Sequence, residues 1–333
     1  MAVTLGPRGS RLLAAGLLAL LLSALVSGSA HAEVSGAPAL PSEGTWRVIA
    51  GDDNGLVSLK RPVGLAPGGG GSVWVALSAD NAIQRIEHEG ALLDRFGTAG
   101  TAGGQLREPR ALATDGDGNV YVADTGNNRV QKLSAVGEPL MSWGLPARIS
   151  DQIVNPVGVA VDAAGNVYIA YAGGRWGLNH RVDKHGPNGQ LLLRMGREPG
   201  GAWGRAQGQF TGPHGVAVDA EGSIYVADTG NHRIQKFDAA GEFVREWGSQ
   251  GRAVGQLDTP RAIAVAGDGD IFVADTGNDR IQRFSTNGAV IATYGERGIE
   301  PGQFRRPEGL MVDADGLLWV ADTDNDRIQV FAP

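Results

Sequence analysis

The sequence predicts an all-β fold of six similar units, and three observations predict it: two recurring markers and one repeated pattern of strands and turns. A proline recurs at steps of 47, 47, 57, 47 and 47 residues, at Pro62, Pro109, Pro156, Pro213, Pro260 and Pro307. A pair of glycines seven residues apart also recurs six times, at Gly44/Gly51, Gly90/Gly97, Gly137/Gly144, Gly189/Gly196, Gly241/Gly248 and Gly288/Gly295. Two independent six-fold markers indicate internal repeats.

The pattern of strands and turns is clearest in the fourth unit. Four stretches with strand composition, "GVAVDA", "SIYVAD", "HRIQKF" and "EFVREW", are joined by the turn residues "EG", "TGN" and "AAG". Strands joined by such short turns are antiparallel neighbours, since a parallel connection needs about a dozen residues. The 52 glycines of the 333-residue chain fit many tight turns. A repeated four-stranded sheet of this length predicts a six-bladed β-propeller.

The two ends of the repeat region complement one another. The sixth unit stops at "RIQVFAP", without a fourth strand, whereas "GTWRVIAG" at residues 44–51 carries the glycine pair ahead of the first repeat proline. We therefore expect the N-terminal strand to complete the last blade, which closes the ring and removes exposed sheet edges.

The first 32 residues have the layout of a secretory signal peptide. Arg8 and Arg11 precede an apolar run at residues 12–26, and small residues at 30 and 32 form a cleavage site. We predict a signal peptide at 1–32, cleaved after Ala32, a linker at 33–43 and the propeller at 44–333, with an uncleaved anchor as the alternative. The protein is then exported, to the periplasm or the medium.

Charge and cysteine content narrow the function classes. The chain has no cysteine, so it forms no disulfide and carries no lipid anchor on cysteine. Its net charge of −7 becomes −9 without the two leader arginines, which disfavours binding to nucleic acid. We expect a monomer with no membrane span after signal cleavage.

The stretch "PHGVAVDAEGSIYVADTGNHRIQKFDAAGEFVREWG" resembles the NHL repeat, and the resemblance extends from Gly44 to Pro333. It implies a propeller. It leaves function open, because the family includes ligand-binding and protein-binding scaffolds, RNA binders and a few enzymes.

The repeated acids are interpreted as structural. Asp124, Asp228, Asp275 and Asp322 lie in the "ADTGNxRxQ" stretches, each with an arginine five residues on. They could form a metal ring or a catalytic set, but a packing role recurs in every blade and an active site does not. "DGDGN" at 115–119 is read as a hairpin turn and not as a calcium loop. No G-x-S-x-G or H-E-x-x-H motif occurs, so no catalytic residue, metal or cofactor is expected.

The position after each repeat proline does vary, and it begins the strand nearest the axis. The six residues there are Val63, Arg110, Val157, His214, Arg261 and Glu308. The loop between the second and third strands lies on the same face as the blade-to-blade connection. This face is therefore the candidate binding face, with Arg110, His214, Arg261 and Glu308 among its residues.

The third unit departs most from the repeat. Tyr171 replaces the acid, and two five-residue insertions lie on the candidate binding face, one in the second-to-third loop and one in the next blade connection. The first brings Arg175, Trp176 and His180. We predict that these residues and Tyr171 help to form a ligand site. The alternative is a drifted blade with an ordinary surface loop.

Two functions follow from this face. The leading one is an exported, non-catalytic scaffold that binds a protein, peptide or cell-envelope polymer. The alternative is an enzyme around His214, which stands in the sequence position where the peptidyl-hydroxyglycine amidating lyases, similar propellers, place zinc-binding histidines. Val63, Arg110, Val157, Arg261 and Glu308 fill the other five positions, so a three-histidine zinc site cannot form there.

Overall fold

The structure is a computed structural model that describes residues 44–51, 57–144, 155–173, 179–196 and 204–333. The chain divides into two compact units, Met1–Ala37 and Pro38–Pro333, and all described residues belong to the second. The predicted signal peptide and linker lie outside the described residues, as do Arg175 and Trp176. Within the described part of the chain, no helix is long and apolar enough to cross a membrane.

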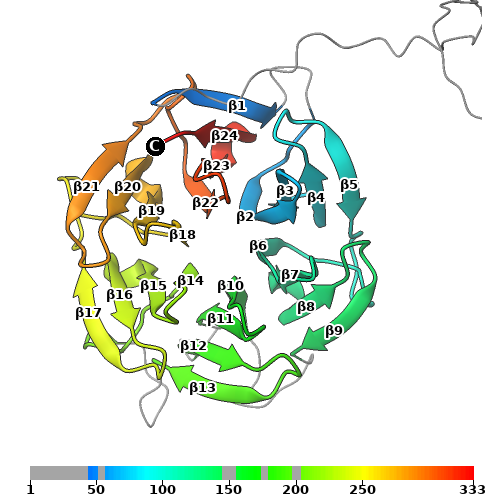
Figure 1. The fold of residues 1–333 in the computed structure, drawn as a ribbon, viewed down its shortest axis with the longest axis horizontal. Coiled ribbons are helices and arrows are strands. Elements are labelled where there is room, and N and C mark those ends of the chain that lie inside the picture. The colour runs from blue at the N-terminus through cyan, green and yellow to red at the C-terminus, as the bar shows by residue number, and fades with distance from the viewer. Residues whose placement is uncertain (1–43, 52–56, 145–154, 174–178, 197–203) are drawn as a thin grey trace, which may run out of the picture. The chain divides into compact units, whose positions relative to one another are not determined.

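Six four-stranded antiparallel sheets surround a common centre, which confirms the predicted propeller (Figure 1). Blade 1 contains β2 (Pro62–Gly69), β3 (Ser72–Leu77), β4 (Ala82–Ile86) and β5 (Leu92–Phe96). Blade 2 contains β6 (Pro109–Thr114), β7 (Val120–Asp124), β8 (Arg129–Leu133) and β9 (Pro139–Trp143). Blade 3 contains β10 (Pro156–Val161), β11 (Val167–Ala172), β12 (His180–His185) and β13 (Leu191–Met195).

Blades 4 to 6 repeat this arrangement. Blade 4 contains β14 (Val216–Val218), β15 (Ile224–Asp228), β16 (Arg233–Phe237) and β17 (Phe243–Trp247). Blade 5 contains β18 (Ile263–Val265), β19 (Ile271–Asp275), β20 (Arg280–Phe284) and β21 (Val290–Tyr294). Blade 6 contains β22 (Pro307–Val312), β23 (Leu318–Asp322), β24 (Arg327–Phe331) and β1 (Trp46–Gly51). The strands that begin with, or soon after, the repeat prolines surround the axis, and the fourth strands form the rim (Figure 1). The first insertion lies between β11 and β12 and the second between β13 and β14, as the repeat register predicts.

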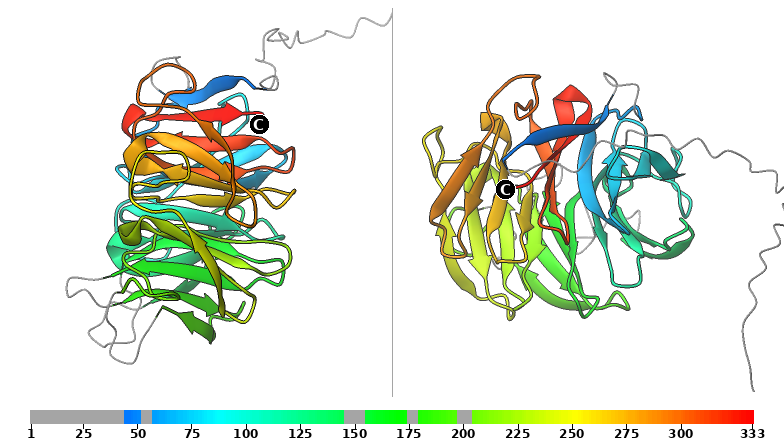
Figure 2. Two further views of the ribbon diagram at one scale, coloured as in Figure 1. Left: turned by 90° about the vertical axis from the view of Figure 1, so that its left-hand side faces the viewer. Right: turned by 45° about the horizontal axis from the view of Figure 1, so that its top comes forward.

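The ring closes as predicted, because β1 pairs antiparallel with β24. The two strands lie side by side in both views of Figure 2. Trp46 of β1 stacks on Phe331 with ring centroids 4.6 Å apart and meets Phe304 edge-on at 5.0 Å. Ile49 and Ala50 are fully buried.

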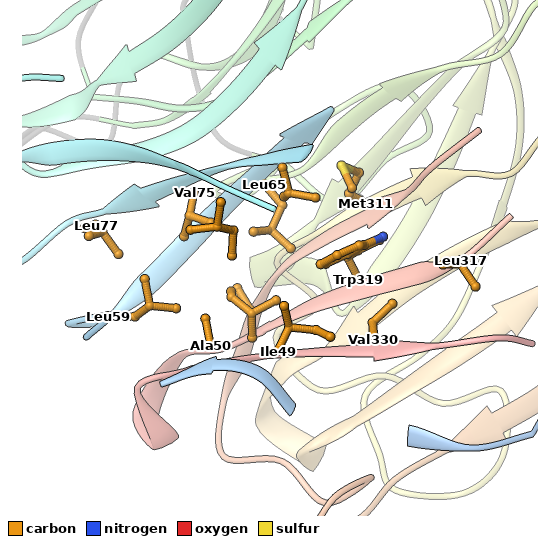
Figure 3. Close-up of a cluster of buried hydrophobic side chains, with 14 residues drawn as sticks. Ile49, Ala50, Leu59, Leu65, Val75, Leu77, Met311, Leu317, Trp319 and Val330 are labelled. Carbon is orange, nitrogen blue, oxygen red and sulfur yellow. The ribbon is translucent and has the colours of Figure 1, made fainter. Parts of the chain in front are cut away.

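The apolar core is divided among the blade interfaces. Each of the six buried clusters draws its side chains mainly from two neighbouring blades. In the cluster of Figure 3, Ile49 and Ala50 from β1 and Trp319 from β23 meet Val75 and Leu77 from β3. The closing strand therefore contributes to the interface between blades 6 and 1 as well as to its own sheet.

Neighbouring inner strands approach closely near the axis, and glycine allows it. A Cβ atom on Gly158 would lie 1.9 Å from the carbonyl oxygen of His214, and one on Gly309 would lie 2.4 Å from that of Val63. Both glycines stand two residues after a repeat proline. The residues after the prolines are thereby brought together around the axis.

Candidate functional site

In blades 1, 2, 3 and 6 the residue after the repeat proline occupies a β-bulge. In β6 the pairing passes from Pro109↔Asp124 to Ala111↔Ala123, which leaves Arg110 as the extra residue. Glu308 is the extra residue of β22 in the same way. In blade 4, both His214 and Gly215 bond to the backbone of Ala227. Bulges are common at barrel rims and beside active sites, because they redirect a side chain.

A central cavity of about 300 Å³ is lined by the six inner strands. Aliphatic side chains three residues after each proline form a ring around its middle and are 5–7% exposed: Leu65, Leu112, Val159, Val216, Ile263 and Leu310. At the end where the inner strands begin, the lining residues are Val63, Arg110, Val157, Arg261 and Glu308. The cavity therefore has a charged mouth and an apolar throat.

The charges at the mouth are partly paired. The Nη1 atom of Arg261 lies 3.4 Å from Oε2 of the buried Glu308, and Nη2 of Arg306 lies 3.2 Å from its Oε1. Among the described residues, Arg110 forms no ion pair and no side-chain hydrogen bond. Burial, followed by the nearby arginines, lowers the pKa of Arg261, although Glu308 opposes this effect. Arg110 is thus the mouth cation whose guanidinium group is available to a ligand.

His214 lies beside this mouth but is not one of the residues that line the cavity. Its Nδ1 atom lies 2.9 Å from the carbonyl oxygen of Gly212, a contact in which the ring nitrogen donates. Burial, together with the positive charges of Arg261 and Arg110, lowers the pKa of His214 to about 4, although the hydrogen bond to Gly212 opposes this effect. The imidazole is therefore neutral at pH 7.

The pKa of His214 predicts an acid-dependent loss of stability. Its folded value of about 4 is below the ordinary 6.5, so the unfolded chain binds the proton more tightly. The resulting stability is fully present above pH 6.5 and is lost as the pH falls toward 4, up to about 3 kcal/mol. Urea unfolding between pH 7 and pH 4 should therefore show a flatter profile for His214→Gln. The same slope in both proteins would contradict this prediction.

The repeated acids are structural, as predicted. In blade 2 the carboxylate of Asp124 accepts the backbone N–H of Arg107 at 2.7 Å and the Nε–H of Arg129 at 2.7 Å. Arg129 also donates to the carbonyl oxygens of Thr101, Ala102 and Gln105 in the connection from blade 1. The Nε2 atom of Gln131 donates to the same carboxylate at 3.1 Å, and we call this arrangement of Asp124, Arg129 and Gln131 the blade clamp. Blades 4, 5 and 6 repeat it around Asp228, Asp275 and Asp322.

In blade 3 the acid is relocated. Tyr171, a predicted ligand-site residue, is fully buried in the cluster between blades 2 and 3 and does not line the axial cavity. The guanidinium of Arg181 lies 4.4 Å above its ring. Burial, followed by the charge of Asp183, raises the pKa of the Tyr171 hydroxyl.

The relocated acid is Asp183, which was not predicted as a site residue. It accepts from Nε of Arg181 at 2.9 Å and from Nε of Arg194 at 2.8 Å. The signal was present in the sequence: aligning "NHRVDKH" with "NHRIQKF" puts Asp183 at the place of the clamp glutamine. Blade 3 therefore keeps an acid–arginine pair, with the acid on the third strand instead of the second.

His180 takes part in a contact that every blade makes. Its Nδ1 accepts the backbone N–H of Gly212 at 2.7 Å, and burial lowers its pKa. The equivalent acceptors in the other blades are Asn81, Asn128, His232, Asp279 and Asp326, each bonded to the N–H before the next blade's proline. His180 therefore joins two blades at the candidate binding face, whatever its role toward a ligand.

The 115–119 stretch is a hairpin turn between β6 and β7, as predicted. The Oδ1 atom of Asp115 accepts the backbone N–H groups of Asp117 and Asn119. No group of three or more histidine, cysteine or acidic side chains that could hold a metal ion occurs among the described residues.

The blades that carry the complete blade clamp are the same blades that match a known repeat family. The NHL repeat model matches residues 106–133, 210–237, 257–284 and 304–331. Four of the six blades are NHL repeats. They are blades 2, 4, 5 and 6, the four that carry the complete clamp. The other two depart at the clamp positions, blade 1 with Leu77 and Ala82 and blade 3 with Tyr171 and Asp183.

The curated relatives align with this chain only over short segments. A stretch of 43 residues is 60% identical to the B-box type zinc finger protein ncl-1 of Caenorhabditis elegans and covers 13% of this chain and 5% of that protein. A stretch of 75 residues is 37% identical to NHL repeat-containing protein 3 of Mus musculus and covers 22% of this chain and 20% of that protein. The alignments thus span a small part of these relatives.

Solved structures share the fold at low sequence identity. A streptogramin B lyase has a TM-score of 0.60 at 16% identity, with 86% of this chain and 96% of that one covered. A gluconolactonase from Xanthomonas campestris has a TM-score of 0.61 at 14% identity, covering 82% and 86%. A Bacteroides thetaiotaomicron protein of unknown function has a TM-score of 0.65 at 17% identity, covering 86% and 75%. At these identities the NHL blades share an architecture with these proteins.

Proposed function

We propose that this protein is an exported, non-catalytic recognition scaffold that binds a protein, peptide or cell-envelope ligand at the mouth of its axial cavity. The observation that carries the proposal is Arg110, a cation without an ion-pair partner among the described residues, at the mouth of a cavity with an apolar throat. The layout of the N-terminal sequence supports export.

The cavity favours a ligand with one acidic group and one apolar group. A guanidinium group binds a carboxylate through two parallel hydrogen bonds, and the aliphatic ring inside the cavity suits an apolar side chain. A volume of about 300 Å³ is at the small end of ligand pockets. It accommodates a side chain or a chain end better than a large cofactor, which favours a peptide or polymer ligand.

The chemistry of the mouth favours binding over catalysis. A general base works best with a pKa near the working pH, whereas burial lowers the pKa of His214 to about 4. Arg261 is already paired with Glu308. We therefore propose that Arg110 binds the ligand and that Arg261 belongs to the same binding mouth. We propose no catalytic residue, no cofactor and no nucleic-acid partner.

The test is capture of a partner from cell-envelope extract by the mature protein. We expect Arg110→Ala/Arg261→Ala to reduce capture at least tenfold, while Arg252→Ala, which removes an exposed arginine that does not line the cavity, leaves it unchanged. Equal capture by the double variant and the unsubstituted protein would contradict binding at the mouth. Both variants should first show a single cooperative unfolding transition, which establishes that they are folded.

An enzyme remains the second candidate, because similar propellers include a lyase and a gluconolactonase. The observation that favours an enzyme is the neutral His214 ring, which lies close enough to Arg261 and Arg110 for them to lower its pKa. Metal analysis of the purified protein separates the two candidates: stoichiometric zinc or calcium would favour the enzyme.

A further inference from the structure

A second hollow, of about 450 Å³, lies between the turns of blades 5 and 6, on the face that carries the cavity mouth. We call it the arginine groove. Blades 5 and 6 are neighbours in the ring (Figure 1), and the segment from β21 to β22 crosses between them. Its lining residues are Thr259, Arg261, Thr276, Gly277, Asp279, Arg297, Arg305, Arg306 and Asp324. Four arginines thus line one hollow of a chain whose net charge is −7.

Two of these arginines are available to a ligand. The exposed side chains of Arg297 and Arg305 form no ion pair or hydrogen bond with the described residues. Arg306 is shared between Glu308, at 3.2 Å, and Asp324, at 3.7 Å. Arg261 also lines the axial cavity, and its lowered pKa includes a contribution from Arg306. Burial and neighbouring positive charge both raise the cost of an uncompensated cation.

The backbone that presents these arginines is held firmly. The N–H of Arg305 donates to Asp322 at 2.7 Å, and its carbonyl accepts the N–H of Asp324 at 3.1 Å. The N–H of Arg306 donates to Asp279 at 2.8 Å. Arg297 pairs with Phe304 in a parallel bridge. These backbone contacts have equivalents in other blades, so the fold supplies the support.

The combination of three arginines is specific to this connection, because no other connection carries arginine at all three positions. At the place of Arg297, the connections before blades 2 and 5 carry Ala99 and Gln250. At the places of Arg305 and Arg306, the connection before blade 5 carries Asp258 and Thr259. The connection before blade 2 carries Arg107 and Glu108 there, and the one before blade 1 carries Lys60 and Arg61. A packing role would recur in every blade, whereas a ligand site occurs in one. The repeat therefore does not account for the arginines that line this groove.

We propose that the arginine groove binds an oxyanion group, a carboxylate or a phosphate, through Arg297 and Arg305. Guanidinium groups bind both oxyanions bidentately, and a rigid backbone reduces the entropy lost on binding. Arg306, held by Glu308 and Asp324, borders the same anion. The groove shares Arg261 with the axial mouth, but Arg297 and Arg305 line the groove and not the axial cavity, so the proposal does not depend on the function proposed for the mouth.

The experiment is calorimetric titration of the purified mature protein at low salt with inorganic phosphate and, separately, with succinate. We expect at least one anion to bind and Arg297→Gln/Arg305→Gln to weaken it at least tenfold. Arg252→Gln, the matched exposed arginine from the previous connection, should bind within twofold of the unsubstituted protein. Tighter binding of phosphate or of succinate identifies which oxyanion the groove prefers.

Three outcomes would overturn the proposal. One is that neither anion binds, and another is that the double variant binds as well as the unsubstituted protein. The third is that Arg110→Gln weakens binding while Arg297→Gln/Arg305→Gln does not, which would place the anion at the axial mouth. A failure of partner capture through Arg110 leaves the groove result unaffected, so the two proposals fail separately.

Discussion

Deleting residues 33–51 is expected to lower the melting temperature by at least about 10 °C or to prevent folding. The deletion removes β1, and with it the buried Ile49 and the Trp46 ring that packs on Phe331 and Phe304. Removing large buried apolar side chains costs about 2–5 kcal/mol each, and 1 kcal/mol is worth about 2–4 °C in a domain of this size. The deletion also exposes the edge of β24 to pairing with other chains.

Deleting residues 33–43 alone is the matched control, because that truncated protein keeps β1 intact. Thermal unfolding followed by circular dichroism compares the two. If the longer deletion melts at the same temperature as the shorter one, the N-terminal strand does not close the ring in solution.

Breaking one blade clamp should have the second largest effect. Asp322→Ala leaves the buried Arg327 without its carboxylate partner, which lies 2.7 Å away. Removing one member of a buried ion pair costs about 3–5 kcal/mol, because the remaining charge stays desolvated. We expect that loss in urea unfolding. Asp268→Ala, which removes a carboxylate with 56% of its side chain exposed, should cost less than about 1 kcal/mol.

A double substitution tests the reason for the loss. Asp322→Leu/Arg327→Ala copies blade 1, where Leu77 and Ala82 occupy the clamp positions and both are fully buried. Without a buried charge, this variant should recover at least about 2 kcal/mol relative to Asp322→Ala. If the double variant is less stable than the single one, the cost comes from lost hydrogen bonds to the connection and not from the unpaired arginine.

The repeat made the architecture predictable. Alternating strand residues, short turns and a constant period are local features, and each has one consistent reading, a four-stranded blade. The structural role of Asp124 and its equivalents followed from repetition alone. Ring closure also followed, because a missing fourth strand at one end matched an extra strand at the other, and β1 pairs with β24.

The candidate site was less predictable, because side-chain direction at a bulge depends on the neighbouring blade. Arg110, Arg261 and Glu308 line the cavity mouth as expected, whereas His214 occupies the same sequence position and is not a lining residue. Tyr171 lies on the correct strand but inside the interface between two blades. Arg297 and Arg305 were not singled out, since they form a groove only where two blades meet.

The sequence by itself determined the number of blades, their strands, the closing strand and the clamps, because these depend on contacts within one repeat or between identical neighbours. The tertiary structure alone decided which variable residues meet. Arg110 and Glu308 come from blades 2 and 6, nearly 200 residues apart in the sequence, and share one mouth because the ring brings all six inner strands to the axis. No local pattern specifies that convergence, and the proposed binding function depends on it.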